Sequence, residues 1–291
     1  MLIRAGGMSI NELLRELRED KIHGASWYFL EGIDIVRTAL ENGLSTNDIR
    51  VLLNELRIVR PGMASILNLA DIIEHALNTG LDLGNVISKL RTWYDSTLER
   101  LKKQLDKFPV MCGSRAITIS YSSAVRTALS RWGKCFEILY VMESKPGDEV
   151  SQAVKDYSSH VGNVIPIPDS AIAFFMRNAN YVISGADGLY SDGYFLNKIG
   201  TETLFIIAHR FDVNTVVISE SYKAAAGGVG DVYSIDVNIA GLSTRTPLFD
   251  KVPLDLIDYL VTDYGIIKKP KPEDIENLRE LFINNILNPS E

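Results

Sequence analysis

The pattern of apolar residues changes near Arg115, and this change constrains the fold more than any other feature of the sequence. After Arg115, short apolar runs alternate with amphipathic segments of helical length. This alternation is typical of strand–helix–strand units with a mainly parallel sheet and right-handed crossovers. The predicted strands span 116–119, 136–141, 164–167, 181–183, 215–218 and 256–261, and the predicted helices between them span 124–132, 149–159, 170–177 and 199–210.

Before this change the sequence predicts helices only. Ser9 and Glu12 have the spacing of a capping box, and Thr79-Gly80 has the composition of a helix C-terminus. A long charged helix over 83–107 closes the region. The predicted fold class is therefore α/β, with an N-terminal helical domain over residues 1–110 and a second domain, built on the mainly parallel sheet, over residues 111–291.

The balance of charge and hydropathy excludes two classes of partner. The 30 Lys and Arg residues are outnumbered by 37 Asp and Glu residues, so the net charge is -7. Nucleic-acid binding dominated by electrostatics needs a basic surface, so we do not expect it. No apolar run approaches the ~20 residues of a membrane span, and the N-terminus lacks the apolar core of a signal peptide. We expect a soluble, cytoplasmic protein without a membrane partner, which starts at Met1 or at Met8.

The cysteine and histidine residues predict no metal site. Cys112 and Cys135 are too few for a disulfide framework or a four-cysteine zinc site. The four histidines are scattered, and no spacing among them is typical of metal ligands. We expect neither a metal nor a cofactor.

The residues that follow the predicted strands are candidates for function, because ligands of open α/β sheets bind beyond the carboxyl ends of the strands. Ser120 and Ser122 follow the first strand and enter a helix, where free N–H groups favour an anion, although helix capping is the simpler explanation. Asp187 follows the fourth strand and could exchange protons or bridge loops. Lys198 is predicted to begin a helix, where a bound phosphate or an ion pair with Asp187 would compensate its charge.

The helical domain adds two candidates. Arg60 precedes Pro61, where its guanidinium could bind a phosphate or contact a helix C-terminus. His23 precedes Gly24 and is more typical of a turn than of a catalyst. Together with the residues of the sheet edge, they predict a pocket for a phosphorylated small molecule.

Short motifs occur in order along the chain, and the most specific pair is Gly185-Ala186-Asp187 followed by Asn197-Lys198-Ile199-Gly200-Thr201. The series resembles the superfamily that joins the regulatory subunits of translation initiation factor 2B with methylthioribose-1-phosphate isomerase and ribose-1,5-bisphosphate isomerase. The resemblance implies an N-terminal helical domain and a Rossmann-like C-terminal domain that forms dimers. The other motifs are Glu143-Ser144-Lys145-Pro146-Gly147, Asp169-Ser170-Ala171, Phe175-Met176, Glu220-Ser221-Tyr222-Lys223, Pro247-Leu248-Phe249-Asp250 and Val261-Thr262-Asp263.

The resemblance also implies roles for particular residues. The isomerases assign their acid/base steps to a cysteine after the first Rossmann strand and to the aspartate of Gly-Ala-Asp, which Asp187 matches. Ser120 stands at the cysteine position. The predicted ligand-binding set is Arg60, Ser120, Ser122, Lys145, Asn197, Lys198 and His23, the last of which stands where the family has an arginine.

The missing cysteine separates two hypotheses of function. An alcohol exchanges a proton near neutral pH far less readily than a thiol, and Cys112 is predicted to lie at the far end of the sheet. We therefore expect a non-catalytic regulatory subunit, similar to those of initiation factor 2B, that binds a phosphosugar or a nucleoside monophosphate in the interdomain cleft.

The resemblance implies a homodimer or a higher oligomer, with translation initiation factor 2 as a candidate partner. The alternative function is an aldose–ketose isomerase acting on ribose-1,5-bisphosphate or methylthioribose-1-phosphate, with Asp187 as the remaining acid/base group. A third hypothesis is a purely structural subunit with a vestigial pocket.

Overall fold

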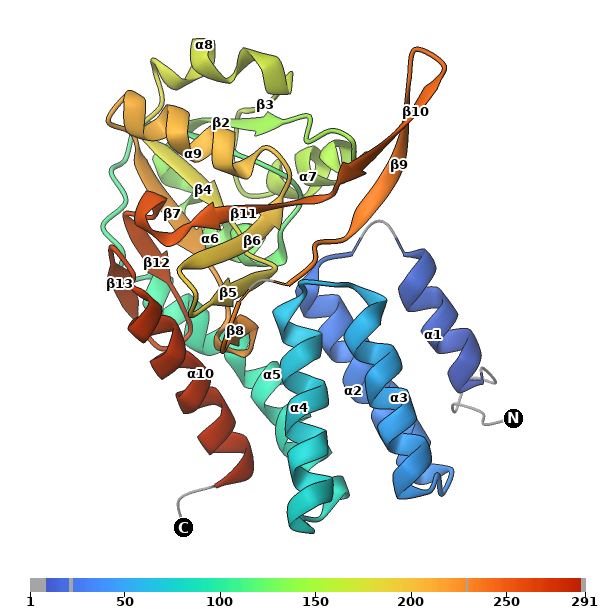
Figure 1. Cartoon of the computed structure of the whole chain (residues 1–291). Helices are drawn as coiled ribbons and strands as arrows, with labels where there is room; N and C mark the ends of the chain where they lie inside the picture. The colour runs from blue at the N-terminus through green and yellow to red at the C-terminus, as the bar shows by residue number, and fades with distance from the viewer. Residues whose placement is uncertain (1–8, 21–22, 229, 289–291) are drawn as a thin grey trace.

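The centre of the molecule is a seven-stranded sheet with the strand order β13-β12-β7-β4-β1-β2-β3 (Figure 1). The computed structural model describes residues 9–20, 23–228 and 230–288. All strands of this sheet run parallel except β13, which pairs antiparallel with β12 at one edge. The predicted α/β fold with a mainly parallel sheet is therefore confirmed. The strands are β1 (Ser114–Thr118), β2 (Phe136–Met142), β3 (Val164–Ile167), β4 (Tyr181–Ser184), β7 (Asn214–Ile218), β12 (Tyr259–Val261) and β13 (Ile266–Lys268).

Helices cover both faces of this sheet. Buried side chains of α6 (Ser123–Trp132) and α7 (Val150–Tyr157) pack on one face, and those of α8 (Ile172–Met176) and α9 (Thr201–Arg210) pack on the other. Because β2 and β3 lie on one side of β1 while β4 and β7 lie on the other, the strand order reverses between β1 and β4. Such a reversal leaves a crevice at the carboxyl ends of the two strands, where open α/β sheets bind ligands.

The N-terminal helices pack below the sheet in the view of Figure 1, together with the C-terminal helix. The capping box of Ser9 and Glu12 is confirmed, and Gly80 ends its helix with a φ of 72°. Phe282 and Ile286 of the C-terminal helix lie in the helical core, so this helix belongs to both parts. The domain division at residue 110 stays a prediction. The helices are α1 (Ile10–Glu19), α2 (Ala25–Glu41), α3 (Thr46–Val59), α4 (Ala64–Thr79), α5 (Leu83–Leu105) and α10 (Pro272–Leu287).

A second, smaller sheet and a two-stranded ribbon do not appear in the predicted pattern. The prediction that Lys198 begins a helix is wrong, because Lys198 ends β6 and pairs with Phe249 of β11. Gly200, with a φ of 98°, turns the chain after this strand, and α9 begins at Thr201. The sheet contains β5 (Gly188–Tyr190), β6 (Tyr194–Lys198), β8 (Ala224–Ala225) and β11 (Phe249–Pro253), and the projecting ribbon contains β9 (Ser234–Ile239) and β10 (Leu242–Pro247) (Figure 1).

The two cysteines lie at the amino ends of β1 and β2, where Cys112 and Cys135 form a disulfide bond. This bond does not follow from the sequence, because two cysteines 23 residues apart do not by themselves indicate that they are neighbours in the fold. The backbone N–H of Gly113 donates to the carbonyl of Cys135 at 2.8 Å beside it. The position of Cys112 at the end of the sheet opposite Ser120 is as predicted.

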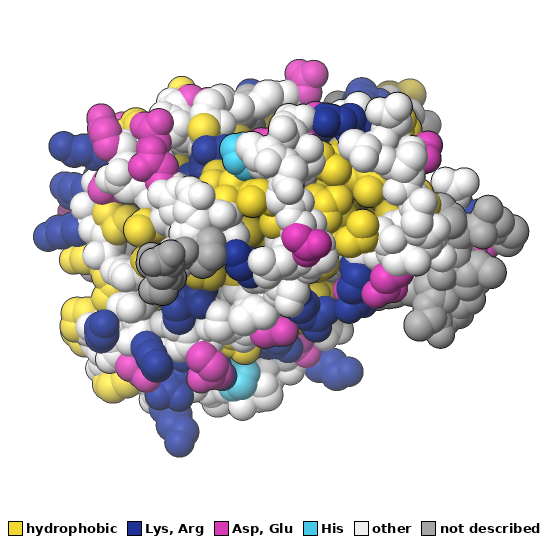
Figure 2. Space-filling view, turned by 90° about the horizontal axis from the view of Figure 1, so that it is seen from below, with side chains coloured by type: hydrophobic (Ala, Val, Ile, Leu, Met, Phe, Trp, Pro, Cys, Tyr) yellow, Lys and Arg dark blue, Asp and Glu magenta, His cyan; other side chains and the backbone are white. Residues whose placement is uncertain are grey.

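The lower face of the molecule is formed largely by helices. Hydrophobic side chains gather in the middle of this face, and many of the charged side chains lie nearer its edges (Figure 2). Among the helices of the described residues, none combines the length and the hydropathy that crossing a membrane requires.

Candidate functional site

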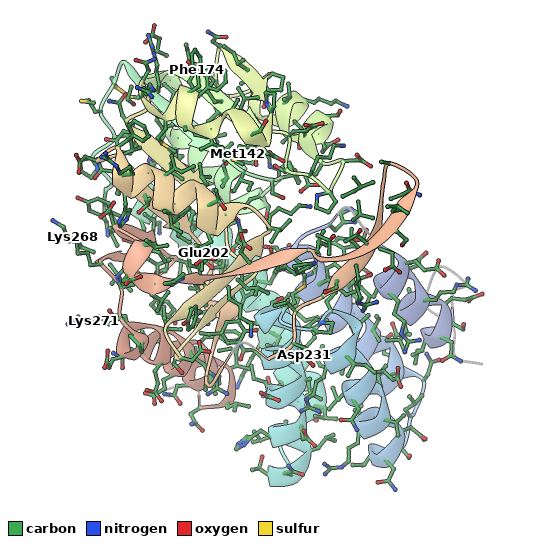
Figure 3. The ribbon with its side chains drawn as sticks, turned by 45° about the horizontal axis from the view of Figure 1, so that its top comes forward. Met142, Phe174, Glu202, Asp231, Lys268 and Lys271 are labelled. Carbon is green, nitrogen blue, oxygen red and sulfur yellow. A yellow bond between two sulfur atoms is a disulfide. The ribbon has the colours of Figure 1, made fainter. Side chains whose placement is uncertain are left out.

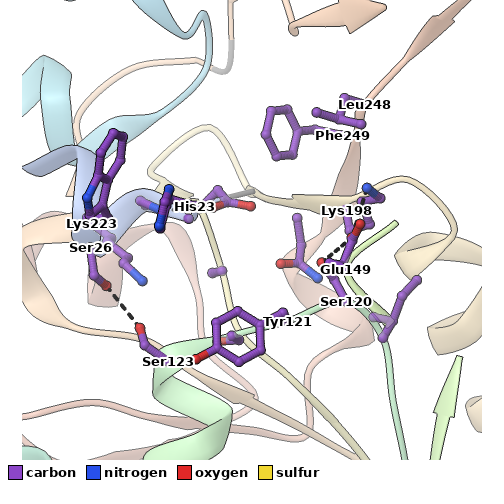
Figure 4. Close-up of a pocket in the computed structure, with 18 of the residues that line it drawn as sticks. His23, Ser26, Ser120, Tyr121, Ser123, Glu149, Lys198, Lys223, Leu248 and Phe249 are labelled. Carbon is purple, nitrogen blue, oxygen red and sulfur yellow. Dashed lines mark hydrogen bonds and ion pairs between the residues drawn. The ribbon is translucent and has the colours of Figure 1, made fainter. Parts of the chain in front are cut away.

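A cavity of about 260 Å³ lies at the carboxyl edge of the main sheet, where β1 and β4 diverge (Figure 4). Its lining comes from α2 and α5 of the helical part, the loops after β1, β2 and β4, and the ends of β6 and β11. The cavity therefore lies between the helical part and the α/β part, and the ligand site expected there stays a prediction. Of the predicted site residues, it brings together His23, Ser120, Ser122, Asp187, Asn197 and Lys198.

Ser120 directly follows the extended chain of β1 and has a φ of 63°, a left-handed conformation that is unusual for serine. Its N–H donates to Ser144 Oγ at 2.8 Å, and its own hydroxyl donates to Glu149 Oε1 at 2.7 Å. Ser144, after β2, also has a φ of 63°. Two neighbouring strands thus end in strained serines that support one another, which is typical of functional sites.

Ser122 caps a helix, which is the simpler of the two roles predicted for it. Its side chain caps α6 by accepting from the N–H of Val125 at 3.3 Å, and its own N–H donates to Tyr157 at 2.9 Å. The N-terminus of α6 nevertheless faces the cavity, since Ser123 also lines it. The first turn of this helix can attract an anion through its dipole.

Lys198 forms a buried ion pair across the cavity wall. Its Nζ lies 2.9 Å from Glu149 Oε1, and the two side chains are each 8% exposed. From the sequence, Asp187 is a possible ion-pair partner of Lys198, but in the structure Glu149 takes this position. The neighbouring Asn197 donates to Thr201 Oγ1 at 2.9 Å, which fixes its amide at the end of β6.

Asp187 lines the cavity after β4 and is partly buried. Its Oδ1 accepts from the N–H of Ala25, at the start of α2, at 3.4 Å. Burial raises the pKa of Asp187, and Glu149 raises it further, while Lys223 and Lys198 lower it. A carboxyl group with a raised pKa can be protonated closer to neutral pH, so Asp187 is able to donate as well as accept a proton.

Three predicted ligand residues have other contacts. Arg60 lies outside the lining, because its Nε donates to the hydroxyl of Tyr28 at 2.6 Å and its guanidinium lies 4.2 Å from the ring centre of Tyr233. Lys145 is exposed and pairs with Asp148 at 2.9 Å, also outside the lining. His23 reaches the cavity edge with its Nδ1 2.7 Å from Asp20 Oδ1, and its ring stacks on Trp27.

The prediction missed two charged residues of the cavity, Lys223 and Glu149. Lys223 forms a buried ion pair with Glu220 at 2.7 Å, and Glu220 Oε1 also accepts from Ser26 at 3.3 Å. Lys223 and Glu149 lie further beyond the ends of β7 and β2 than Asp187 lies beyond β4, so a search directly after each strand does not find them. Lys223 ends the motif that begins at Glu220, and Glu149 lies two residues after the motif that ends at Gly147.

Each lysine at the cavity is paired with a carboxylate, and Asp187 adds a further carboxyl group. Two lysines, Lys198 and Lys223, face or adjoin three carboxyl groups, those of Glu149, Asp187 and Glu220. Within the described residues, no group of three His, Cys, Asp or Glu side chains is placed to hold a metal ion. The arrangement can bind a polar molecule rich in hydroxyl groups, with an anion near the first turn of α6.

Known proteins are similar to this chain both in sequence and in fold. The model of the Initiation factor 2 subunit family matches residues 21–269. An eIF-2B subunit 2-like protein from Pyrococcus horikoshii is 30% identical over 273 residues, covering 89% of this chain and 96% of its own length. Ribose 1,5-bisphosphate isomerase from Methanocaldococcus jannaschii is 26% identical, covering 76% of this chain and 77% of its own.

Solved structures have similar folds. Translation initiation factor eIF-2B from Pyrococcus horikoshii OT3 gives a TM-score of 0.77 at 26% identity, covering 91% of this chain and 98% of that one. The tetrameric eIF2B-beta2-delta2 complex from C. thermophilum gives a TM-score of 0.64 at 14% identity, covering 93% of each chain. Similar folds thus occur in a multi-subunit assembly.

Proposed function

The chain belongs to the Initiation factor 2 subunit family, and on this premise we propose that it is a regulatory subunit that binds a phosphosugar or a nucleoside monophosphate without isomerising it. One observation carries the proposal. The cavity at the carboxyl edge of the sheet contains the hydroxyl of Ser120, while both cysteines are joined in a disulfide at the opposite end.

The chemistry of isomerisation explains why this matters. Exchange between an aldose and a ketose moves a proton between adjacent carbons, and a group that gives and takes a proton near neutral pH must touch them. A thiol can be tuned into this range, whereas an alcohol lies far above it. The Ser120 hydroxyl also donates to Glu149, which holds its proton in place.

Binding is supported by the type of groups that the cavity presents. Ser123 and the first turn of α6 provide backbone donors and a positive dipole end, and Lys223 adds a buried ammonium group. Asn197 and Asp187 add partners for sugar hydroxyls. Trp27 and Tyr94 provide flat apolar surfaces against which a sugar ring or a base can pack.

Thermal melts with added ligand test the proposal. Ribose-1,5-bisphosphate, methylthioribose-1-phosphate and adenosine monophosphate are added at increasing concentration, and a ligand at about 100 times its Kd stabilises a protein by ~2.7 kcal/mol. We expect at least one to raise the Tm by several degrees, and we expect Lys223→Met to abolish this rise. Lys145→Met is the matched control, because this lysine lies outside the cavity. No rise with any of the three ligands would contradict the proposal.

Asp187 favours isomerisation as the second candidate function, because it lines the cavity with a raised pKa. An assay of ketose formation from ribose-1,5-bisphosphate and methylthioribose-1-phosphate, with wild type beside Asp187→Asn, decides between the two. Turnover by the wild type that Asp187→Asn abolishes would establish the isomerase. Under the favoured proposal, neither protein produces a ketose.

We further propose a cytoplasmic homodimer or higher oligomer that contacts translation initiation factor 2, with the ligand cavity between domains 1–110 and 111–291. Two exposed apolar side chains support self-association, Phe174 on α8, which is 70% exposed, and Ile206 on α9, which is 52% exposed. Phe174 lies on the outer side of the α/β part (Figure 3). Light scattering during size-exclusion chromatography tests this, and Phe174→Asp with Ile206→Asp should give monomers.

A further inference from the structure

We propose that Glu149 is a specificity-determining residue whose carboxylate occupies one anion position of the cavity, so that the site accepts a sugar monophosphate in preference to a bisphosphate. The inference rests on the proposed function and narrows its ligand. The carboxylate lies between Lys198 and Ser120, both of which line the cavity (Figure 4).

The contacts of Glu149 are those that a phosphate oxygen would make. An ammonium group at 2.9 Å and a serine hydroxyl at 2.7 Å both point at Oε1. Charged donors and hydroxyl groups of this kind are common ligands of phosphate as well as of carboxylate. A phosphate group that binds between Lys198 and Ser120 would have to displace the Glu149 carboxylate.

The loop after β2 places the Glu149 carboxylate in the wall of the cavity. Glu149 immediately precedes α7, and Gly147 lies so close to the pair that a Cβ there would collide with both the carboxylate and the ammonium group. The side chains of Glu149 and Lys198 are almost completely buried, so water screens their attraction poorly. The pair is therefore part of the folded cavity rather than a surface contact.

The remaining charges leave room for one phosphate group. The N-terminus of α6 lies in the lining and can attract an anion, whereas Lys198 and Lys223 are already paired with Glu149 and Glu220. A bisphosphate would place its second phosphate close to Glu149, and like charges in a poorly solvated site repel strongly. A hydroxyl group at the same point could instead donate a hydrogen bond to the carboxylate.

The ratio of two dissociation constants tests the inference. Isothermal titration gives the Kd of ribose 5-phosphate and of ribose-1,5-bisphosphate for the wild type and for Glu149→Gln. We expect the wild type to bind the monophosphate at least as tightly as the bisphosphate. Glu149→Gln should shift the ratio by about tenfold or more toward the bisphosphate, because it removes a buried charge and keeps the shape.

Asp148→Asn is the matched control. Asp148 is the neighbouring carboxylate, its side chain is 93% exposed, and it pairs with Lys145 outside the cavity. Its replacement removes the same charge from the same loop, and we expect the ratio to change less than about twofold, since exposed charges are screened. An unchanged ratio in Glu149→Gln, or an equal change in Asp148→Asn, would overturn the inference.

Two further measurements keep the test decisive. If Glu149→Gln does not fold, Glu149→Asp retains the charge but withdraws it from Lys198, and its ratio should shift in the same direction by a smaller factor. If the wild type binds neither sugar phosphate, the proposed function fails, and inorganic phosphate then tests Glu149 alone. Phosphate should stabilise Glu149→Gln but not Glu149→Gln with Lys198→Met, and equal stabilisation of the two would overturn the inference.

Discussion

The two ends of the main sheet are held in different ways. At the amino end, neighbouring strands are joined by neutral groups and by an exposed ion pair of Arg115 with Glu137. The neutral contacts are the Cys112–Cys135 disulfide and the side chain of Asn180, which accepts from the N–H of Arg115 at 2.9 Å. At the carboxyl end, Ser120 has a strained backbone and Glu149 forms a buried ion pair with Lys198. The amino end gains stability from its contacts, whereas the carboxyl end holds charged groups whose burial costs stability.

The buried charges at the carboxyl end lower the stability of the fold. Removing charges from water is expensive, and neutral side chains of similar size would often be at least as stable. Lys223 and Glu220 repeat the arrangement beside the same cavity. Two buried lysine–carboxylate pairs at one end of a sheet are consistent with the proposed binding of a charged, hydroxyl-rich molecule.

Removal of the disulfide should have the largest effect and should be confined to stability. Cys112 and Cys135 are 23 residues apart, and closing a loop of this length contributes about 3 kcal/mol through the unfolded state. Replacing both residues by serine should lower the free energy of unfolding by about this amount, measured with urea under oxidising conditions. Ligand binding should not change at temperatures where the variant is folded.

The control for this prediction is the wild type under reducing conditions, which should match the serine variant. If the serine variant lost ligand binding while it remained folded, the two ends of the sheet would not be independent. The contrast drawn between them would then be wrong.

Breaking the Lys198–Glu149 pair should have the second largest effect. Lys198→Met leaves the carboxylate buried without its cation, and we expect a loss of about 2 kcal/mol, below the usual range for fully buried pairs because both side chains line the cavity and keep 8% exposure. Adding Glu149→Gln should recover most of the loss. Urea unfolding of the two single variants and the double variant measures the coupling.

Lys102→Met is the matched control for this pair. Lys102 pairs with the exposed Glu99 one turn away on α5, at 2.7 Å. Exposed pairs of this kind contribute less than about 0.5 kcal/mol, so the control should be nearly neutral. Equal losses in the two lysine variants would show that the carboxyl end carries no special electrostatic cost.

The sequence predicted the main sheet better than the site built on it. β1, β2, β3, β4 and β7 lie within two residues of their predicted positions, because an apolar run between two helices is a strong local pattern. The strand predicted over 256–261 is shorter in the structure, where it is β12, because a helical turn over Leu254–Leu256 precedes it. The strands of the small sheet were missed, because Gly188–Tyr190 is only three residues long and Tyr194–Lys198 merges with the helical pattern after it.

The sequence predicts a site residue correctly when its location follows from the end of a strand. It fails when the location depends on contacts with residues far away in the sequence. Asp187 and Ser120 follow strands and reach the cavity. Arg60 does not line the cavity, because Tyr28 and Tyr233 bind its guanidinium, and no local pattern reports these contacts. Glu149 and Lys198 are 49 positions apart in the sequence, so their ion pair is seen only in the folded chain.

Asp187→Asn should have the smallest effect on the free energy of unfolding, and this effect should depend on pH. Burial raises the pKa of Asp187 in the folded state above its ordinary value in the unfolded chain. As the pH rises from about 4 toward neutrality, the unfolded state therefore loses this proton first, and the wild type loses stability relative to Asp187→Asn. At low pH the carboxyl group is neutral in both states, so the difference between the two proteins should be smallest there.

Urea unfolding of both proteins between pH of about 4 and about 7.5 measures this difference, and subtracting the two curves removes the titration of all other groups that they share. We expect the subtracted free energy to increasingly favour Asp187→Asn as the pH rises, by less than the loss in Lys198→Met. The opposite slope would show that Lys223 and Lys198 stabilise the carboxylate by more than its burial costs. In that case the carboxyl end of the sheet would gain stability from its charges, as the amino end does from its neutral contacts.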